Sequence, residues 1–278
     1  MKYDPGELTS FRASDGNVVK IEHFKDLPST VELAREYAIA GKADRYVVFA
    51  ERQATSNIIG TRLSDGAYEK GIFMSIILRP AIFPSQAGLL GPLATTALVS
   101  AFEEHTTKNA GIGWISNVIY NGQKIGGCAI EGKLNDYSSY EYLIVSLALK
   151  LDDKLFTPRL TDMIRAVFDD ESPSVSLLIA KTVLNKFFAV YMDIKNPSKH
   201  MDFYKQKFCQ YGKTVKYILD GKRHTGKIVD VDKSNCTLVV ADSSENTFCV
   251  TSPSSLIIPQ KPGIYDAIRN RITQKKQN

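Results

Sequence analysis

Several polar residues in this chain occupy positions that helix or strand patterning does not require. They are Ser29 and Thr30 at the start of a predicted helix, Gln53 after a predicted strand, the loop that follows it, and Lys124. Lys124 lies between an Asn-Gly turn and the pair Gly126-Gly127, where backbone can approach a ligand closely, and its ammonium offers three donors to an anion. Each residue also has an ordinary explanation, since Ser29 suits a helix N-cap and Lys124 suits a solvated hairpin. The order of the segments must therefore decide between these interpretations.

The cysteines and histidines show no metal-binding spacing. The four cysteines form no CxxC pair, and the four histidines fall in no HxxxH or CxxH arrangement. A structural zinc site normally needs such spacing. We therefore expect no metal site in this chain.

Alternating and helical apolar patterns predict the elements that position these residues. Expected strands cover residues 18–24, 46–51, 71–80, 114–120, 126–132 and 142–151. Expected helices cover 26–41, 86–105, 173–191 and 199–211, with a short helical piece in the connection 152–174. Ser29 and Glu32 have capping-box spacing, and Gly41 suits a helix end. The pattern predicts an α+β fold, a sheet with helices packed on one side.

The pattern changes after Gly212 to short strands separated by turns, which predicts a small antiparallel β-barrel. The predicted organisation is a polar lead-in (1–18), a large domain (19–211), the small barrel (212–260) and a basic tail (261–278). Residues 205–278 carry 13 Lys and Arg against 6 Asp and Glu. A solvated lysine-rich surface explains this excess more simply than a polyanion partner does.

Composition excludes several classes of protein. The 278 residues are 44% hydrophobic and 23% charged with a net charge of +5, which does not fit a collagenous, disordered or disulfide-scaffold chain. The polar N-terminus does not resemble a signal peptide, and no run approaches about 18 apolar residues. We expect a cytoplasmic protein with reduced thiols and no membrane partner.

Taken together, the segments resemble the biotin protein ligase family from about residue 20 to residue 258. The sharpest matches are Ala50–Gln53, Gly71–Pro80, and Asn121–Gly127 followed by Glu131. The resemblance implies a biotin/lipoate ligase-type domain at 19–211, with a mixed sheet and packed helices, and an SH3-like domain at 212–260. It also implies a reaction in which biotin and ATP, with Mg²⁺, form biotinyl-5'-AMP before biotin passes to a lysine of a biotin carrier domain.

The resemblance assigns roles to individual residues. Biotin-binding positions are Ser29, Thr30, Gln53, Lys124 and Gly126, and Lys124 is also the catalytic position, which holds the carboxylate. Nucleotide-side positions are Asn57, Arg62, Trp114, Ser116 and Asn117. The lipoate signature RRxSGGGxVxHD is missing, so biotin is favoured over lipoate. A homodimer is a further expectation, and no DNA-binding domain is expected because only about 20 residues precede the match.

The sequence departs from the family pattern on the nucleotide side. The adenylate-binding loop, GRGRxGRxW in the family, reads SNIIGTRLS at 56–64, so that Asn57 and Ile59 replace arginines. The family's KWPND corresponds to Gly113–Asn117, which keeps the tryptophan but loses the lysine, the proline and the carboxylate. The family's GxGxN corresponds to Ser146–Lys150, where the glycines and the asparagine are replaced. Losing one preorganised donor typically costs about 10²–10³ in rate. The adenylate-binding site is therefore predicted to be degenerate.

Three functions stay open from the sequence. The first is an active ligase in which Arg62, and Lys70 with it, supplies the missing charge. The second is a non-catalytic pseudo-ligase that acts as a small-ligand-binding, regulatory or protein-interaction module. The third is a structural or subunit role that uses the barrel and the basic tail. A biotin-dependent ATP–pyrophosphate exchange assay separates the first two.

Overall fold

The computed structural model describes residues 6–56, 58, 61–62, 68–106, 108–150 and 175–257. The helical piece expected within 152–174, the basic tail and the first part of the lead-in lie outside these residues. The chain divides into two compact units, one of Met1–Gln210 with Asp232–Cys236 and one of Tyr211–Val231 with Thr237–Asn278. In the described part of the chain, no helix has both the length and the apolar character needed to cross a membrane.

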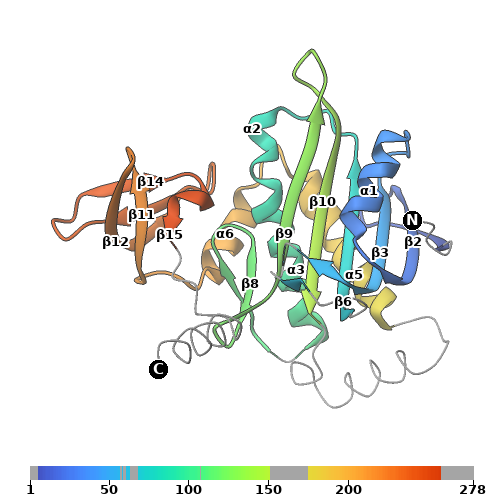
Figure 1. Ribbon diagram of the computed structural model, residues 1–278, viewed down its shortest axis with the longest axis horizontal. Helices are drawn as coiled ribbons and strands as arrows, with labels where there is room; N and C mark the ends of the chain where they lie inside the picture. Colours follow the sequence, from blue (N-terminus) through green and yellow to red (C-terminus); the bar gives the residue numbers. More distant parts are fainter. Residues whose placement is uncertain are drawn as a thin grey trace, which may run out of the picture. The chain divides into compact units, whose positions relative to one another are not determined.

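The first unit is built on an eight-stranded sheet in the order β1-β2-β3-β6-β10-β9-β8-β7 (Figure 1). The strands are β1 (Glu7–Arg12), β2 (Val18–Leu27), β3 (Tyr46–Gln53), β6 (Glu69–Leu78), β7 (Gly111–Gly113), β8 (Asn117–Tyr120), β9 (Gln123–Leu134) and β10 (Tyr140–Lys150). Strands β2 and β3 are parallel and the other neighbours antiparallel, so the predicted mixed sheet is confirmed. Strand β1 lies within the segment 1–18, which was expected to be a polar lead-in, and it pairs with β2. A separate short pair joins β4 (Thr55–Ser56) to β5 (Thr61–Arg62).

Helices cover both faces of this sheet, which corrects the expectation of helices on one side. They are α1 (Thr30–Ile39), α2 (Pro84–Ala87), α3 (Leu90–His105), α5 (Val175–Met192) and α6 (Ser198–Lys207). Successive strand residues point to opposite faces. On β9, Glu131 reaches α1 through Arg35, whereas the side chain of Ile130 lies 3.8 Å from a Cβ built on Gly91 of α3. Helices α1 and α3 therefore lie on opposite faces, as Figure 1 shows.

Three predicted element boundaries were wrong. The helix expected at 86–105 is broken between α2 and α3. The helix expected at 199–211 ends at Lys207, because Phe208 is extended and bridges to Ile112 of β7. Trp114, expected at the start of a strand, lies in the turn between β7 and β8, where its backbone N–H donates to Gln210 Oε1 at 2.7 Å.

The second unit holds a five-stranded antiparallel sheet in the order β14-β13-β12-β11-β15. Its elements are β11 (Thr214–Leu219), β12 (Lys222–Val231), β13 (Leu238–Ala241), β14 (Thr247–Val250), the 3-10 helix η2 (Pro253–Ser255) and β15 (Leu256–Ile257). Tyr217, Ile228 and Val240 are fully or almost fully buried in it. The predicted C-terminal set of short antiparallel strands is confirmed.

Candidate functional site

The predicted residues at the N-terminus of α1 meet Gln53 because of the local topology. Strands β2 and β3 run parallel with Leu27 opposite Gln53, so both end at the same edge of the sheet. Helix α1 begins directly after β2, with Ser29 as its N-cap. The backbone N–H of Thr30 donates to Gln53 Oε1 at 2.8 Å, and Ser29 Oγ accepts a longer hydrogen bond from the Glu32 N–H at 3.4 Å. Three residues that are up to 24 positions apart in sequence thus form one polar cluster.

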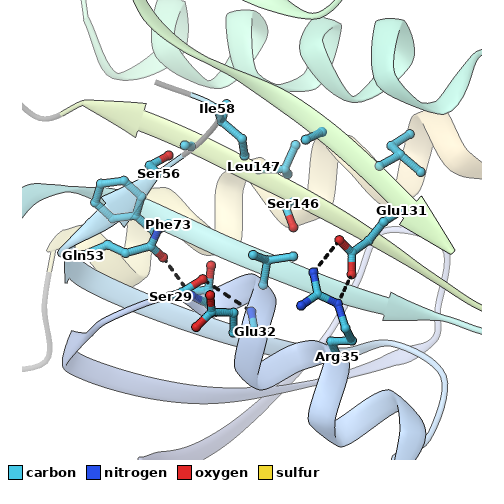
Figure 2. Close-up of a pocket in the computed structure, with 15 residues that line it drawn as sticks. Ser29, Glu32, Arg35, Gln53, Ser56, Ile58, Phe73, Glu131, Ser146 and Leu147 are labelled. Atoms are coloured by element: carbon cyan, nitrogen blue, oxygen red, sulfur yellow. Dashed lines mark hydrogen bonds and ion pairs between the residues drawn. The ribbon is translucent and has the colours of Figure 1, made fainter. Parts of the chain in front are cut away.

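A cavity of about 280 Å³ lies beneath this end of α1 (Figure 2). Its floor consists of neutral polar side chains that are at least nine-tenths buried, namely Ser29, Thr30, Gln53, Ser56 and Ser146. Apolar walls come from Phe73 and Leu147, with Ile58 at the side. Pockets that combine apolar walls with a few convergent polar groups are typical small-molecule sites.

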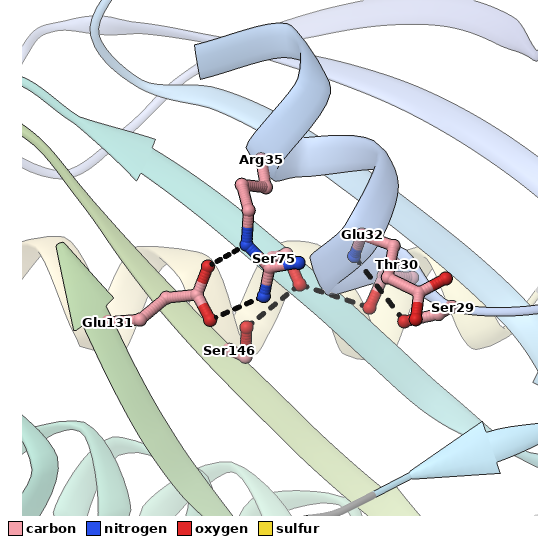
Figure 3. A network of polar contacts seen from close by, with 7 residues as sticks. All are labelled: Ser29, Thr30, Glu32, Arg35, Ser75, Glu131 and Ser146. Carbon is pink, nitrogen blue, oxygen red and sulfur yellow. Dashed lines mark hydrogen bonds and ion pairs between the residues drawn. The ribbon is translucent and has the colours of Figure 1, made fainter. Parts of the chain in front are cut away.

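A chain of hydroxyl groups supports the floor (Figure 3). Ser75 of β6 is fully buried, and its Oγ donates to Thr30 Oγ1 at 3.0 Å. Ser75 Oγ is also 2.9 Å from Ser146 Oγ of β10. The chain fixes the orientation of two side chains that line the cavity. Because these groups are uncharged, the floor suits a ligand head group that is polar but neutral.

The rim of the cavity is charged. Arg35 of α1 forms a two-pronged ion pair with Glu131 of β9, with Nε–Oε1 and Nη2–Oε2 distances of 2.7 Å each. These hydrogen bonds raise the pKa of the Arg35 guanidinium above its ordinary value. The Glu32 side chain adds a second carboxylate to the same rim. Sequence reasoning used Glu131 only as part of a motif and did not single out Arg35.

Lys124 does not line the cavity, yet it lies on the same face of β9. Asn117 pairs with Gly127, Val118 with Gly126, and Ile119 with Lys124, so the register shifts at the extra residue Ile125. This bulge places Lys124 on the face of Gly127, Ala129 and Glu131, about 15 Å along the strand from Ala129. Among the described residues Lys124 has no ion-pair partner, and desolvation by the surrounding protein lowers the pKa of its ammonium.

The two glycines beside Lys124 serve close packing. A Cβ on Gly126 would lie 2.5 Å from the carbonyl oxygen of Ala148, and one on Gly127 would lie 2.4 Å from that of Ser116. Gly126 faces away from the cavity and is not one of its lining residues. Gly127 keeps the face of β9 flat between Lys124 and the cavity.

Three of the predicted nucleotide-side residues, Trp114, Ser116 and Asn117, are not among the described residues that line this cavity. Trp114 is buried and its indole N–H donates to the carbonyl oxygen of Cys236 at 2.7 Å, while Asn117 Nδ2 donates to the Trp114 carbonyl oxygen at 2.9 Å. Ser116 lines a second cavity, of about 530 Å³, on the α3 side of β9. Arg62 belongs to β5. Asn57 lies outside the described residues.

No cluster suited to a metal ion forms among the residues that the structure describes. There, no group of three or more His, Cys, Asp or Glu side chains comes together in a way that could hold an ion. The chemistry of the main cavity thus rests on hydroxyls, one amide and the charged rim.

Comparison with known proteins places this architecture among biotin protein ligases. The chain superposes on the biotin protein ligase of Aquifex aeolicus in complex with biotin and ATP with a TM-score of 0.62 and 16% identity, covering 85% of this chain and 97% of that one. A biotin protein ligase-like protein of unknown function from Silicibacter sp. superposes with a TM-score of 0.55 and 15% identity, covering 86% and 97%.

One curated protein matches in sequence. The bifunctional ligase/repressor BirA of Bacillus subtilis is 30% identical over 105 residues, which is 38% of this chain and 32% of that protein. The match thus spans about a third of the relative's length. No family model matches the chain.

Proposed function

Because this chain has the biotin protein ligase fold, we propose that it binds biotin in the cavity beneath α1. The observation that carries the proposal is the floor of neutral, nearly buried polar side chains, with Ser29, Thr30 and Gln53 held together by the crossover from β2 to β3. A ureido ring offers two N–H donors and one carbonyl acceptor, and this floor supplies hydroxyl and amide partners for both kinds of group.

The acidic arm of the ligand would leave the cavity along β9 toward Lys124. Lys124 is a cation without an ion-pair partner among the described residues, and it lies on the cavity face. Gly127 puts no side chain in the path. Lys124 is exposed, and the partial desolvation that lowers the pKa of its ammonium is offset when a carboxylate binds it. The neutral head would thus lie on the floor and the acid at the lysine.

Calorimetry with biotin and its uncharged amide tests this arrangement. A hydrogen bond to a charged group contributes about 1.5–3 kcal/mol, so Lys124→Ala should weaken biotin binding roughly tenfold to a hundredfold and leave the amide unaffected. The matched control is Lys133→Ala, which changes a lysine of the same strand that is paired with Glu141 and lies outside the cavity. Absence of saturable biotin binding to the unmodified chain would refute the proposal.

A second function, biotin binding without adenylation, is favoured by the positions and hydrogen-bond partners of the predicted nucleotide-side residues. The Trp114 indole donates to the Cys236 carbonyl oxygen, Asn117 donates to the Trp114 carbonyl oxygen, and Ser116 faces another cavity. The sequence also places Asn57 and Ile59 where the resembled family has arginines. The chain would then act as a small-ligand-binding, regulatory or protein-interaction module.

The alternative is a ligase that forms biotinyl-5'-AMP from biotin and ATP with Mg²⁺ and passes biotin to a carrier-domain lysine. In that case Lys124 is the catalytic residue that holds the reacting carboxylate. Biotin-dependent ATP–pyrophosphate exchange that Lys124→Ala abolishes would establish the enzyme. Biotin binding without exchange would establish the non-catalytic module.

A further inference from the structure

The guanidinium of Arg35 offers hydrogen-bond donors at the rim that its partner Glu131 does not use. A guanidinium carries five N–H donors in a planar fork. Glu131 accepts one hydrogen bond from Nε and one from Nη2, each of 2.7 Å. Nη1 lies opposite the Nε–Nη2 edge of the fork, and it has no hydrogen-bond partner in the described part of the chain. Both N–H groups of Nη1 can therefore donate to a ligand.

This third nitrogen is directed over the cavity (Figures 2 and 3). Arg35 follows Val31 by four residues on α1, so the two side chains share a face of the helix, and both line the cavity. Glu131 approaches the guanidinium from β9, on the other side. In both views Nη1 is turned away from Glu131 and toward the side on which Ser29 lies. The ion pair thus orients the donors of Nη1 toward the space that a ligand would fill.

The charges at the rim favour a neutral acceptor over an anion. Arg35 is one cation among the lining residues, and Glu32 and Glu131 are two carboxylates. A ligand carboxylate or phosphate bound there would meet two like charges, which disfavours its binding. A carbonyl oxygen accepts from Nη1 without bringing a charge of its own. The rim therefore suits a head group that ends in a neutral carbonyl.

We propose that Arg35, oriented by Glu131, selects the ligand by donating from Nη1 to a neutral carbonyl oxygen at the end of the head group that is far from the acid. The inference rests on the proposed function, because it takes the orientation in which the acid lies at Lys124. On β9, Glu131 comes two residues after Ala129, on the side away from Lys124. In biotin the ureido carbonyl oxygen is at the opposite end of the molecule from the carboxylate, so this orientation brings it to Arg35. Glu131 is then a positioning residue for Arg35.

Calorimetry with biotin and with its thiourea analogue tests the assignment, because a thiocarbonyl sulfur accepts hydrogen bonds much more weakly than a carbonyl oxygen. Arg35→Met keeps the length of the side chain and removes its donors. It should weaken biotin binding roughly tenfold and weaken binding of the thiourea analogue less than about threefold. Glu131→Gln should lower the same preference for biotin by roughly threefold, because an amide cannot hold both prongs of the fork. The matched control, Lys133→Met, removes a cation of β9 that pairs with Glu141 outside the cavity and should change neither affinity.

The outcomes separate this assignment from the proposed function. Equal losses for the two ligands in Arg35→Met, or no loss of either, overturn the assignment and leave the proposed function standing. If the unmodified chain binds no biotin, the proposed function fails, and ethyleneurea, a cyclic urea without an acidic arm, decides the assignment by itself. Its titration at millimolar concentration into isotope-labelled protein, followed by NMR, should shift resonances of the cavity residues, and Arg35→Met should abolish these shifts. The absence of such shifts, or their persistence in Arg35→Met, overturns the assignment.

Discussion

Removing the Ser75 hydroxyl should both destabilise the first unit and weaken ligand binding, although Ser75 does not line the cavity. Ser75 is fully buried, and its Oγ joins Thr30 and Ser146 through hydrogen bonds of 3.0 and 2.9 Å. Each neutral hydrogen bond contributes about 1 kcal/mol, and a buried partner left unsatisfied costs about 1–3 kcal/mol. We expect Ser75→Ala to lower the free energy of unfolding by about 2–3 kcal/mol.

The single tryptophan gives a selective assay for this prediction. Trp114 is buried within the first unit, so urea unfolding followed by its fluorescence reports on that unit. A loss of 2–3 kcal/mol corresponds to a fall in Tm of about 5–10 °C for a domain of this size. The matched control is Ser10→Ala, which removes an exposed strand hydroxyl and should cost less than about 0.5 kcal/mol.

A double-mutant cycle sharpens the test of the hydroxyl chain. When Ser146→Ala is added to Ser75→Ala, the unsatisfied Ser146 hydroxyl disappears, so the double variant should lose about 1 kcal/mol less than the sum of the single losses. Biotin affinity should fall several-fold in Ser75→Ala because Thr30 and Ser146 lose their fixed orientation. Strict additivity, or a Ser75→Ala cost equal to that of the Ser10→Ala control, would show that the three hydroxyls do not act as a network.

Three further predictions concern the surroundings of the cavity. Desolvation lowers the pKa of Lys124, so the ammonium loses its proton at a pH below the ordinary lysine pKa of 10.5. Biotin affinity measured by calorimetry should therefore fall as the pH rises through that lowered pKa. The Lys124→Gln variant should show no such fall. Gly127→Ala would place a Cβ 2.4 Å from the Ser116 carbonyl oxygen and should lower the unfolding free energy by about 1–3 kcal/mol, seen as a lower Tm by circular dichroism. Trp114→Phe removes the indole donor to the Cys236 carbonyl oxygen and should cost about 1–3 kcal/mol in the same assay; an unchanged Tm would mean that this hydrogen bond is not formed in solution.

Local signals were sufficient to predict the start of α1. The Ser29 and Glu32 spacing marks a cap within one turn of chain, and Gly41 ends the helix region with a φ of 83°. Such features depend on residues close in sequence. Most strands of the sheet were predictable for the same reason, because strand patterning and turn residues are local, whereas the mixed sheet was implied by the family resemblance.

Trp114 shows where local patterning fails. The apolar run from 114 to 120 predicts a strand, but the backbone N–H of Trp114 bonds Gln210, and its indole bonds Cys236. Both partners lie about a hundred residues or more further along the chain. Arg35 and Glu131 are similarly distant in sequence, so a helix-surface arginine gave no sign that it pairs with Glu131 at the rim of a cavity.

Lys124 is the instructive case for the site, because strict strand alternation would place it wrongly. Residues 124 and 127 are three apart, so an unbroken strand would direct their side chains to opposite faces. The bulge at Ile125 inserts one residue and returns Lys124 to the face of Gly127 and the cavity. Matching the sequence motif to the family assigns Lys124 to the site without any knowledge of the bulge. The alternation of side chains in a regular strand does not predict the bulge and would assign Lys124 to the wrong face. The cation that the proposed acid ligand needs is thus brought to the binding face by one extra residue in one strand, and deleting Ile125 should remove Lys124 from that face while leaving the polar floor beneath α1 in place.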